Sequence, residues 1–206
     1  MKTRMSVIIT LAGLFIAGCG EPETVMIDTA NDDGKAVMAL DYRDFDQAAS
    51  EMIQSMISSG ALKKPGGGRY VVTTARITND TMQRIDTDQL MAKIEEELMN
   101  SGQVVMTSAV GGQGAPDEMI YEMRDIRDSA TGEEFQQDTL AGKRTLVAPE
   151  LSFSGKILQR NIRYDSNRQQ VEYYFQLRVT DLTTGLRFWQ KESIIGKRGS
   201  NRSVSW

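Results

Sequence analysis

The residues best suited to chemistry in this chain are Ile16-Ala17-Gly18-Cys19, which end a short apolar run preceded by two basic residues. They form a bacterial lipobox: small side chains fit beside the bond that a lipoprotein signal peptidase cleaves, and the thiol carries the diacylglycerol. The run is shorter than the ~20 apolar residues that span a bilayer and fits a secretory signal. The pattern predicts a signal peptide over residues 1–18 and lipid attachment at Cys19. An uncleaved anchor, or a signal peptide with a chance cysteine, is the alternative.

The cysteine count favours the same interpretation. Cys19 is the only cysteine of the chain, so it has no partner for an internal disulfide, and in an exported protein such a thiol needs another explanation. Lipidation provides this explanation. Acyl chains on the cysteine would anchor the protein to a membrane, with ~0.8 kcal/mol contributed by each buried CH₂ group. Gly20 follows the cysteine, whereas an aspartate there is the usual signal for retention in the inner membrane. We therefore expect an outer-membrane anchor with the protein facing the periplasm.

The remaining residue types exclude most catalytic chemistry. The chain has no histidine, which removes histidine acid–base catalysis, the Ser-His-Asp triad and most zinc sites. Asp86 and Asp88 are two apart on an expected helix and do not share a face. The glycine-rich stretch Lys63–Gly68 lacks the Gly-Lys-Ser/Thr order of a phosphate loop. The sequence predicts that the protein is not an enzyme and has no cofactor, metal or small-molecule substrate; a carboxylate glycosidase or an unrecognised ligand binder is the alternative.

Charge is distributed unevenly along the chain. Of the 24 basic side chains, 12 lie in residues 143–206, whereas only 5 of the 28 acidic ones do. A basic half can indicate an acidic partner, but nucleic acid does not fit an exported protein. The alternative is that both halves interleave in one domain. We expect a flexible tether over residues 19–40, which are polar and poor in aromatics, and one globular domain over residues 41–206.

Hydrophobic periodicity predicts three helices in the first two thirds of this domain. Asp44 is expected to cap the first helix, which Gly60 ends, and Asp86 to cap the second, which Gly102 ends. Pro116 is expected to open the third at its first turn. A short further helix around residues 135–141 is left open. The side chains expected on the buried side of the third helix are Met119, Ile120, Met123 and Ile126.

The strands follow from β-branched residues and alternating apolar positions. They are expected at residues 70–77, 104–106, 151–157, 171–179 and 186–195. Turns at Asp165-Ser166-Asn167 and Thr183-Thr184-Gly185 make the last strands hairpins. The fold class is therefore α/β: a single-layer mixed sheet of about four to five strands flanked by helices, ending in long hairpin-linked antiparallel strands.

Two groups of polar and aromatic residues are candidates for partner binding. The turn Asn79-Asp80-Thr81, together with Arg84, follows a strand end, where a rigid sheet can present it. Arg163 and Tyr164 flank the hairpin at Asp165, and Arg and Tyr are enriched at interface hot spots. The alternatives are that the first group only stabilises its turn and that the second is a solvated hairpin tip.

An ordered series of motifs resembles the LpoB family of penicillin-binding-protein activators. It runs from about residue 45 to residue 196. The first half carries Arg76-Ile77-Thr78-Asn79-Asp80-Thr81, then Ile85-Asp86-Thr87-Asp88 and a helix that ends in Ser101-Gly102. The second half adds Leu151–Ile157, the long strand Tyr173–Asp181 and Trp189-Gln190-Lys191-Glu192.

The resemblance implies a fold related to the N-terminal domain of TolB and a non-enzymatic role. Such a lipoprotein hangs from the outer membrane, docks on a bifunctional class A penicillin-binding protein and stimulates peptidoglycan synthesis. Two features depart from the family. The leader is short and almost free of proline, and Ala148-Pro149-Glu150 replaces the usual Gly-Ala-Asp/Glu-Tyr at a strand start. The alternative role is that of an outer-membrane scaffold subunit in a secretion or surface-assembly machine, which the short leader favours.

Overall fold

The computed structural model describes residues 28–29 and 34–202. The chain divides into two units, Met1–Lys35 and Ala36–Trp206. Among the described residues, every helix and strand lies in the second unit. The predicted signal peptide and Cys19 lie outside the described residues. The boundaries expected for the signal peptide, the tether and the domain stay predictions.

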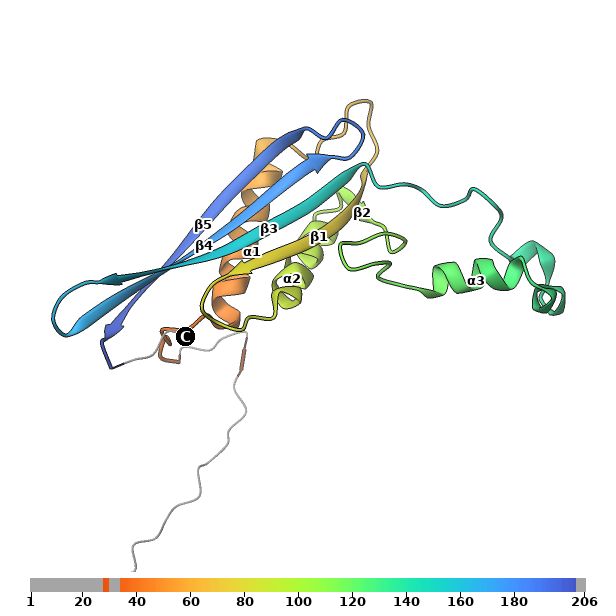
Figure 1. Cartoon of the computed structure of the whole chain (residues 1–206). Helices are drawn as coiled ribbons and strands as arrows, with labels where there is room; N and C mark the ends of the chain where they lie inside the picture. Colours follow the sequence, from red (N-terminus) through yellow and green to blue (C-terminus); the bar gives the residue numbers. More distant parts are fainter. Residues whose placement is uncertain (1–27, 30–33, 203–206) are drawn as a thin grey trace, which may run out of the picture. The chain divides into compact units, whose positions relative to one another are not determined.

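The second unit is built on one five-stranded sheet with strand order β2-β1-β3-β4-β5 (Figure 1). Strand β1 pairs in parallel with both β2 and β3, whereas β3, β4 and β5 form two antiparallel hairpins. The strand bounds are β1 Tyr70–Asp80, β2 Val104–Met106, β3 Leu151–Arg163, β4 Arg168–Asp181 and β5 Arg187–Ser200. The predicted mixed α/β sheet is confirmed, with three long antiparallel strands.

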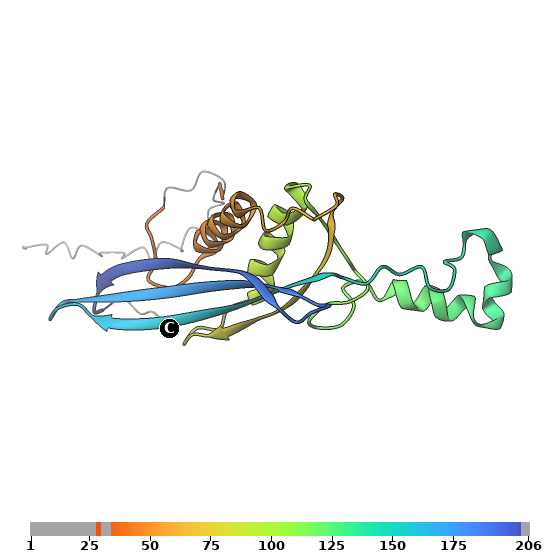
Figure 2. The same ribbon diagram turned by 90° about the horizontal axis from the view of Figure 1, so that it is seen from above.

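Helices α1 (Tyr42–Ser59) and α2 (Thr87–Asn100) lie on the same face of this sheet (Figure 2). The core fills the space between them and the strands. Every second residue of β4 from Val171 to Val179 is buried there, because side chains alternate between the faces of a strand. Burying one such side chain stabilises the fold by about 1.5–3 kcal/mol.

The start of α1 differs from the prediction. Asp41, and not Asp44, is the N-cap, and Asp44 stands at the third position of a capping box. The Asp41 Oδ1 atom accepts a hydrogen bond from the Arg43 N–H at 2.9 Å, and Asp44 Oδ2 accepts one from the Asp41 N–H at 2.7 Å. Two aspartates three residues apart can each act as a cap, and the reciprocal bonds make the earlier one the boundary.

The third helix is shorter than predicted and its apolar side is not buried. Helix α3 spans Met119–Arg127, contains no buried residue, and begins after Glu118 rather than at Pro116. Both views show α3 away from α1 and α2 (Figures 1 and 2). Met119 keeps 52% of its surface exposed. The prediction that this stripe joins the core is wrong.

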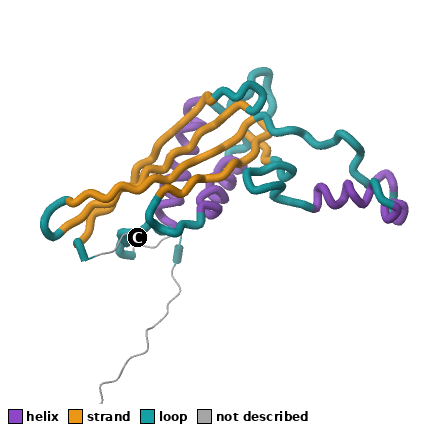
Figure 3. The backbone as a smooth tube through the Cα atoms, in the orientation of Figure 1, coloured by secondary structure: helices purple, strands orange, loops and turns teal. Residues whose placement is uncertain are grey.

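Short 3-10 turns replace the helix left open around residues 135–141. They span Ala130–Glu134 (η1) and Gln137–Thr139 (η2). A long loop then leads to β3 (Figure 3). We call residues 117–149 the α3 arm. Gly132 packs η1 tightly on α3, since a Cβ atom there would lie 2.6 Å from the Ile126 carbonyl oxygen.

Candidate functional site

Strands β1 and β3 are parallel, so both end at the same end of the sheet, which we call the hairpin end. Asp80 of β1 pairs with Leu158 of β3, and β3 continues to Arg163 before the chain turns into β4. The strand-end residues Asn79–Arg84 and the hairpin residues Arg163 and Tyr164 were predicted separately from the sequence. The sheet brings these two groups to one end.

The loop after β1 is held by its own polar side chains. The Asn79 Oδ1 atom accepts hydrogen bonds from the Thr81 N–H at 3.1 Å and from the Thr81 hydroxyl at 2.7 Å. The Asn79 side-chain amide also donates to the Gln83 carbonyl at 2.8 Å. Asp80 forms an ion pair with Lys156 of β3 at 2.6 Å. Asn79, Thr81 and Asp80 therefore fix the loop, whereas Arg84 is exposed.

Met82 stands in the middle of this loop and was missed by the sequence analysis. Its side chain is 73% exposed. Its backbone N–H donates to Gln159 Oε1 at 3.2 Å, and the Asn161 side-chain amide lies 3.4 Å from its sulfur. These contacts join the loop to β3 two residues before Arg163. An exposed Met on an ordered loop suits an interaction surface, because its side chain adapts to different partners.

The hairpin carries an exposed tyrosine with two arginines over its ring. The guanidinium carbon of Arg168 lies 5.1 Å from the centroid of the Tyr164 ring, and that of Arg198 lies 3.8 Å from it. Arg198 comes from β5 and was not predicted. Arg163 is exposed and borders a cavity of about 230 Å³ with Asn201.

Asp165 shapes the hairpin turn. Its Oδ1 atom accepts from the Asn167 N–H at 2.8 Å and the Arg168 N–H at 2.7 Å, and its Oδ2 atom accepts from Arg168 Nε at 2.7 Å. The Asn167 N–H and the Arg168 side chain hold the pKa of the Asp165 carboxyl below its usual value. The turn is thus ordered at neutral pH, and its exposed Arg side chains give this tip a positive charge.

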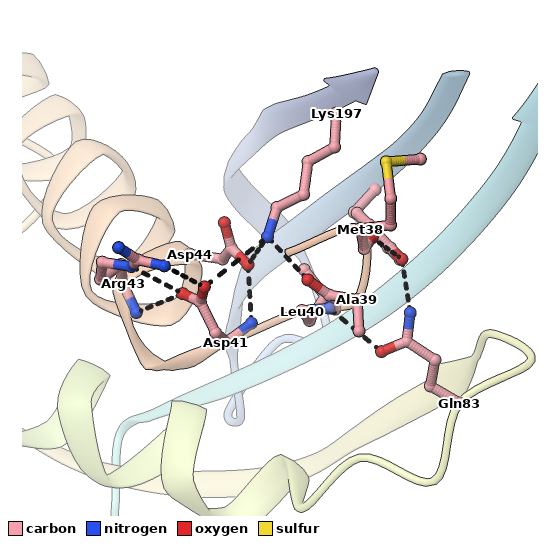
Figure 4. Close-up of polar contacts among 9 residues, drawn as sticks. Met38, Ala39, Leu40, Asp41, Arg43, Asp44, Gln83 and Lys197 are labelled. Carbon is pink, nitrogen blue, oxygen red and sulfur yellow. Dashed lines mark hydrogen bonds and ion pairs between the residues drawn. The ribbon is translucent and has the colours of Figure 1, made fainter. Parts of the chain in front are cut away.

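A polar cluster ties the strand-end loop and strands β4 and β5 to the start of the domain (Figure 4). Gln83, which is 8% exposed, accepts a hydrogen bond from the Leu40 N–H at 3.1 Å and donates one to the Tyr173 hydroxyl. That hydroxyl donates to the Met38 carbonyl at 2.9 Å. Lys197 of β5 donates to the Ala39 carbonyl at 2.7 Å. Residues 38–40 are therefore bound from two sides.

Two titrating groups of this cluster have shifted pKa values. Burial raises the pKa of Tyr173 to about 12, because a buried phenolate is poorly solvated. Burial also raises the pKa of Asp41, but the Arg43 hydrogen bonds and the Lys197 charge outweigh it and leave that pKa below its usual value. Lys197 also forms a 2.5 Å ion pair with Asp44, and each of the two side chains is only 9% exposed.

Away from the hairpin end, a cavity of about 250 Å³ lies beside β1. Two carboxylates on α2 line it. Glu95 accepts a hydrogen bond from the Thr74 hydroxyl at 2.7 Å, and Asp88 accepts one from the Gln113 side-chain amide at 2.9 Å. These bonds explain both carboxylates as structural groups.

Within residues 28–29 and 34–202, no group of three or more His, Cys, Asp or Glu side chains could hold a metal ion. Within the same described ranges, no helix combines the length and the apolarity needed to cross a membrane. Cys19, where lipid attachment is predicted, lies outside these ranges.

Comparison with known proteins gives a family match and several distant structural relatives. The model of the family described as peptidoglycan-synthase activator LpoB matches residues 44–195. No curated protein matches the chain.

Among solved structures, the LpoB C-terminal domain from Escherichia coli has a TM-score of 0.43 and 12% identity, covering 74% of this chain and 98% of that one. The same domain from Salmonella enterica has a TM-score of 0.42 and 11% identity, with 74% and 98% covered. The lipoprotein GNA1162 from Neisseria meningitidis has a TM-score of 0.38 and 11% identity, with 66% and 87% covered.

The family match covers well over half of the 206 residues, from α1 to β5. It includes the strand-end loop and the hairpin described above. The resemblance seen in the sequence motifs is confirmed, and this chain belongs to the LpoB family of peptidoglycan-synthase activators.

Proposed function

We propose that this protein is a lipoprotein of the outer membrane that faces the periplasm and activates a class A penicillin-binding protein. The family match over residues 44–195 is the observation that carries the proposal. The lipobox at Ile16–Cys19 agrees with it, since a lipid on Cys19 would hold the domain at a membrane outside the cytoplasm. Its role is regulatory, and the synthase supplies the catalysis.

We assign synthase docking to the hairpin end of the sheet. The docking surface consists of the strand-end loop and the hairpin tip, that is, Asn79, Asp80, Thr81, Met82, Arg84, Arg163, Tyr164, Arg168 and Arg198. Tyr and Arg often dominate binding energy when they form the centre of an interface. The hydrogen bonds around Asn79 and Asp165 hold both elements before a partner arrives, which lowers the entropy lost on binding.

Activation on this surface is a shift of populations in the synthase. A bound protein can favour the active state only by binding that state more tightly than the inactive one. A tenfold preference corresponds to about 1.4 kcal/mol. A few well-placed hot-spot contacts suffice for this difference, so the activator needs no catalytic group.

The tether limits where the synthase can be met. If the protein is anchored at Cys19, residues 19–40 reach at most about 70 Å when fully extended. A relaxed chain reaches much less. We therefore propose that the synthase extends toward the outer membrane or that the periplasm is thin in the native cell.

The test is a matched pair of surface substitutions. Met82→Glu adds a charge to a side chain that is 73% exposed at the hairpin end, and Leu186→Glu does the same to one that is 66% exposed in the β4–β5 turn at the opposite end. Burying an unpaired carboxylate in an interface is strongly unfavourable. We expect Met82→Glu to weaken synthase binding at least about tenfold and Leu186→Glu to leave it unchanged.

Binding is read by crosslinking pull-down of the tagged protein from cell envelopes, followed by mass spectrometry. Glycan polymerisation by the purified synthase gives the second readout. Equal loss in both variants would remove the docking assignment. Recovery of secretion or surface-assembly components without any synthase would sink the activator role and favour the scaffold role.

A further inference from the structure

Residues 36–40, which lead into the domain, form a hydrogen bond with the strand-end loop of the docking surface (Figure 4). We call these residues the entry segment. Met38 is only 8% exposed, whereas the preceding residues 34–37 are exposed. This segment lies just before α1, about forty residues from the loop in sequence, and yet it contacts Gln83 directly.

The contacts between them involve the side chains of Gln83 and Tyr173 and the backbone of the entry segment. Gln83 accepts from the Leu40 N–H at 3.1 Å and donates to the Tyr173 hydroxyl. The same hydroxyl donates to the Met38 carbonyl at 2.9 Å. Gln83 is thus held by the entry segment directly and through Tyr173. The Leu40 N–H and the Met38 carbonyl lie outside any helix or strand, and these side chains give them hydrogen-bond partners.

Gln83 stands next to Met82 in the docking surface. Its backbone N–H donates to the Thr81 hydroxyl at 3.1 Å, and its carbonyl accepts from the Asn79 side chain at 2.8 Å. The exposed loop therefore has one buried anchor, and that anchor depends on residues 38–40. A buried polar group that loses its hydrogen-bond partner destabilises the structure around it. We therefore expect a change in the entry segment to affect the loop through Gln83.

We infer that the entry segment is a positioning part of the docking surface: through Gln83 it holds the loop Thr81–Arg84 in the shape that binds the partner. Gln83 and Tyr173 are positioning residues and do not themselves touch the partner. The inference rests on the proposed docking function for its consequence, but the coupling between segment and loop is a property of this chain alone. Displacing the entry segment would then break its hydrogen bonds to Gln83 and Tyr173 and make the loop less ordered.

Hydrogen–deuterium exchange of the full chain tests the coupling without any partner. Gln83→Met removes the side-chain hydrogen bonds to the Leu40 N–H and the Tyr173 hydroxyl at nearly constant volume. We expect the amides of Leu40 and residues 81–84 to exchange about tenfold faster, as for the loss of one buried hydrogen bond, with unchanged exchange in the centre of the sheet. The control is Gln113→Met, which removes one exposed bond to Asp88 on a loop outside the docking surface.

The decisive variant removes a contact of the entry segment that does not involve the loop. Lys197 binds the Ala39 carbonyl at 2.7 Å and lies on β5. Lys197→Met combined with Asp44→Asn frees that carbonyl without leaving a buried charge, and the new amide can still accept from the Asp41 N–H. We expect faster exchange at residues 82–84 here too. Unchanged exchange in the loop would overturn the inference, because the segment would then have no influence on it.

Tyr173→Phe provides a second route should the double variant unfold. It removes the bond to the Met38 carbonyl while the ring still fills the core, and we expect the same faster exchange in the loop; normal loop exchange in this variant would also overturn the inference. Synthase binding by these variants is measured separately. If the unaltered chain binds no synthase, the proposed function fails while the exchange result stands.

Discussion

The hairpin end of the sheet and the α3 arm are both exposed, yet they are ordered in different ways. At the hairpin end, Tyr173 and Lys197 connect the entry segment to strands more than a hundred residues away. In the arm, the Arg124 and Arg127 side chains bind carbonyl groups of the arm itself, at Ile120 and Ala141. The first region depends on long-range contacts and the second on local ones.

This difference shows that an amphipathic pattern is no measure of burial. Helix α3 has apolar residues at helical spacing, as α1 does, but α1 buries seven side chains and α3 buries none. The hairpin end has a polar sequence, and it nevertheless contains the buried ion pair of Lys197 and Asp44. We therefore expect substitutions in the two regions to differ strongly in their effect on stability.

The largest difference is expected for two ion pairs. Lys197→Met leaves Asp44 charged, buried and without its 2.5 Å partner. Breaking a buried pair in this way typically destabilises a protein by about 3–5 kcal/mol. Urea unfolding at pH 7 measures the free energy of unfolding.

Arg127→Met is the matched change in the arm, where Arg127 pairs with the half-exposed Asp128 at 2.7 Å. Exposed pairs contribute about 0–1 kcal/mol. Similar losses in the two variants would mean that the arm is as firmly packed as the hairpin end, against the comparison drawn above.

A pair of methionines gives the next effect in size. Met56 of α1 is 0% exposed and Met119 of α3 is 52% exposed. Met56→Ala creates a cavity and should lower the free energy of unfolding by about 2–5 kcal/mol, whereas Met119→Ala should change it by less than about 0.5 kcal/mol. Thermal and urea unfolding provide the measurement. A large loss for Met119→Ala would show that its apolar side is buried in solution.

A smaller effect is expected at high pH from Tyr173. Its pKa is raised to about 12 in the folded protein, against about 10 in an unfolded chain. The folded state holds the proton more tightly, so this stabilisation is complete below pH ~10 and is lost as the pH rises through about 12. The loss, for two pKa units at about 1.4 kcal/mol each, amounts to about 2.7 kcal/mol.

The Tyr173→Phe variant isolates the contribution of Tyr173 ionisation to the free energy of unfolding. Hydrogen bonding to Glu172 also raises the pKa of Tyr174, so both proteins lose stability in alkali, and only the difference between them reports on Tyr173. Urea unfolding at pH 9 and pH 11 gives that difference. Parallel pH dependence of the two proteins would contradict a raised pKa of Tyr173 in the native state.

Much of the fold could be predicted because its signals are local. Alternation from Val171 to Val179, the turn at Asp165 and the cap at Asp86 each depend on residues close in sequence. Part of the docking surface was found for the same reason, since turns at strand ends have characteristic residues: these are Asn79, Asp80, Thr81, Arg84, Arg163 and Tyr164. The structure places them at one end of the sheet, and their role in binding stays a proposal.

The missed features depend on distance along the chain. Nothing near Gln83 indicates that it is buried against residues 38–40, and nothing near Lys197 indicates an ion pair with Asp44, which lies 153 positions away. Met82 was missed because exposure of a single apolar residue in a loop has no periodic signal. The apolar side of α3 was wrongly predicted to be buried. Hydrophobic periodicity shows that a helix has an apolar face, but it does not show whether another element packs against that face.

The chain is fastened to one strand, β1, on either side of the α3 arm. The Gly112 N–H donates to the Thr74 carbonyl at 2.8 Å, and the Glu150 N–H donates to the Val71 carbonyl at 2.7 Å. Their attachment points are three residues apart, or about 10 Å along a strand. Everything between them is a closed excursion that the core does not require, so the arm can change its length or its content while the sheet keeps its register. It offers a place to insert a fluorescent domain or a purification tag away from the hairpin end.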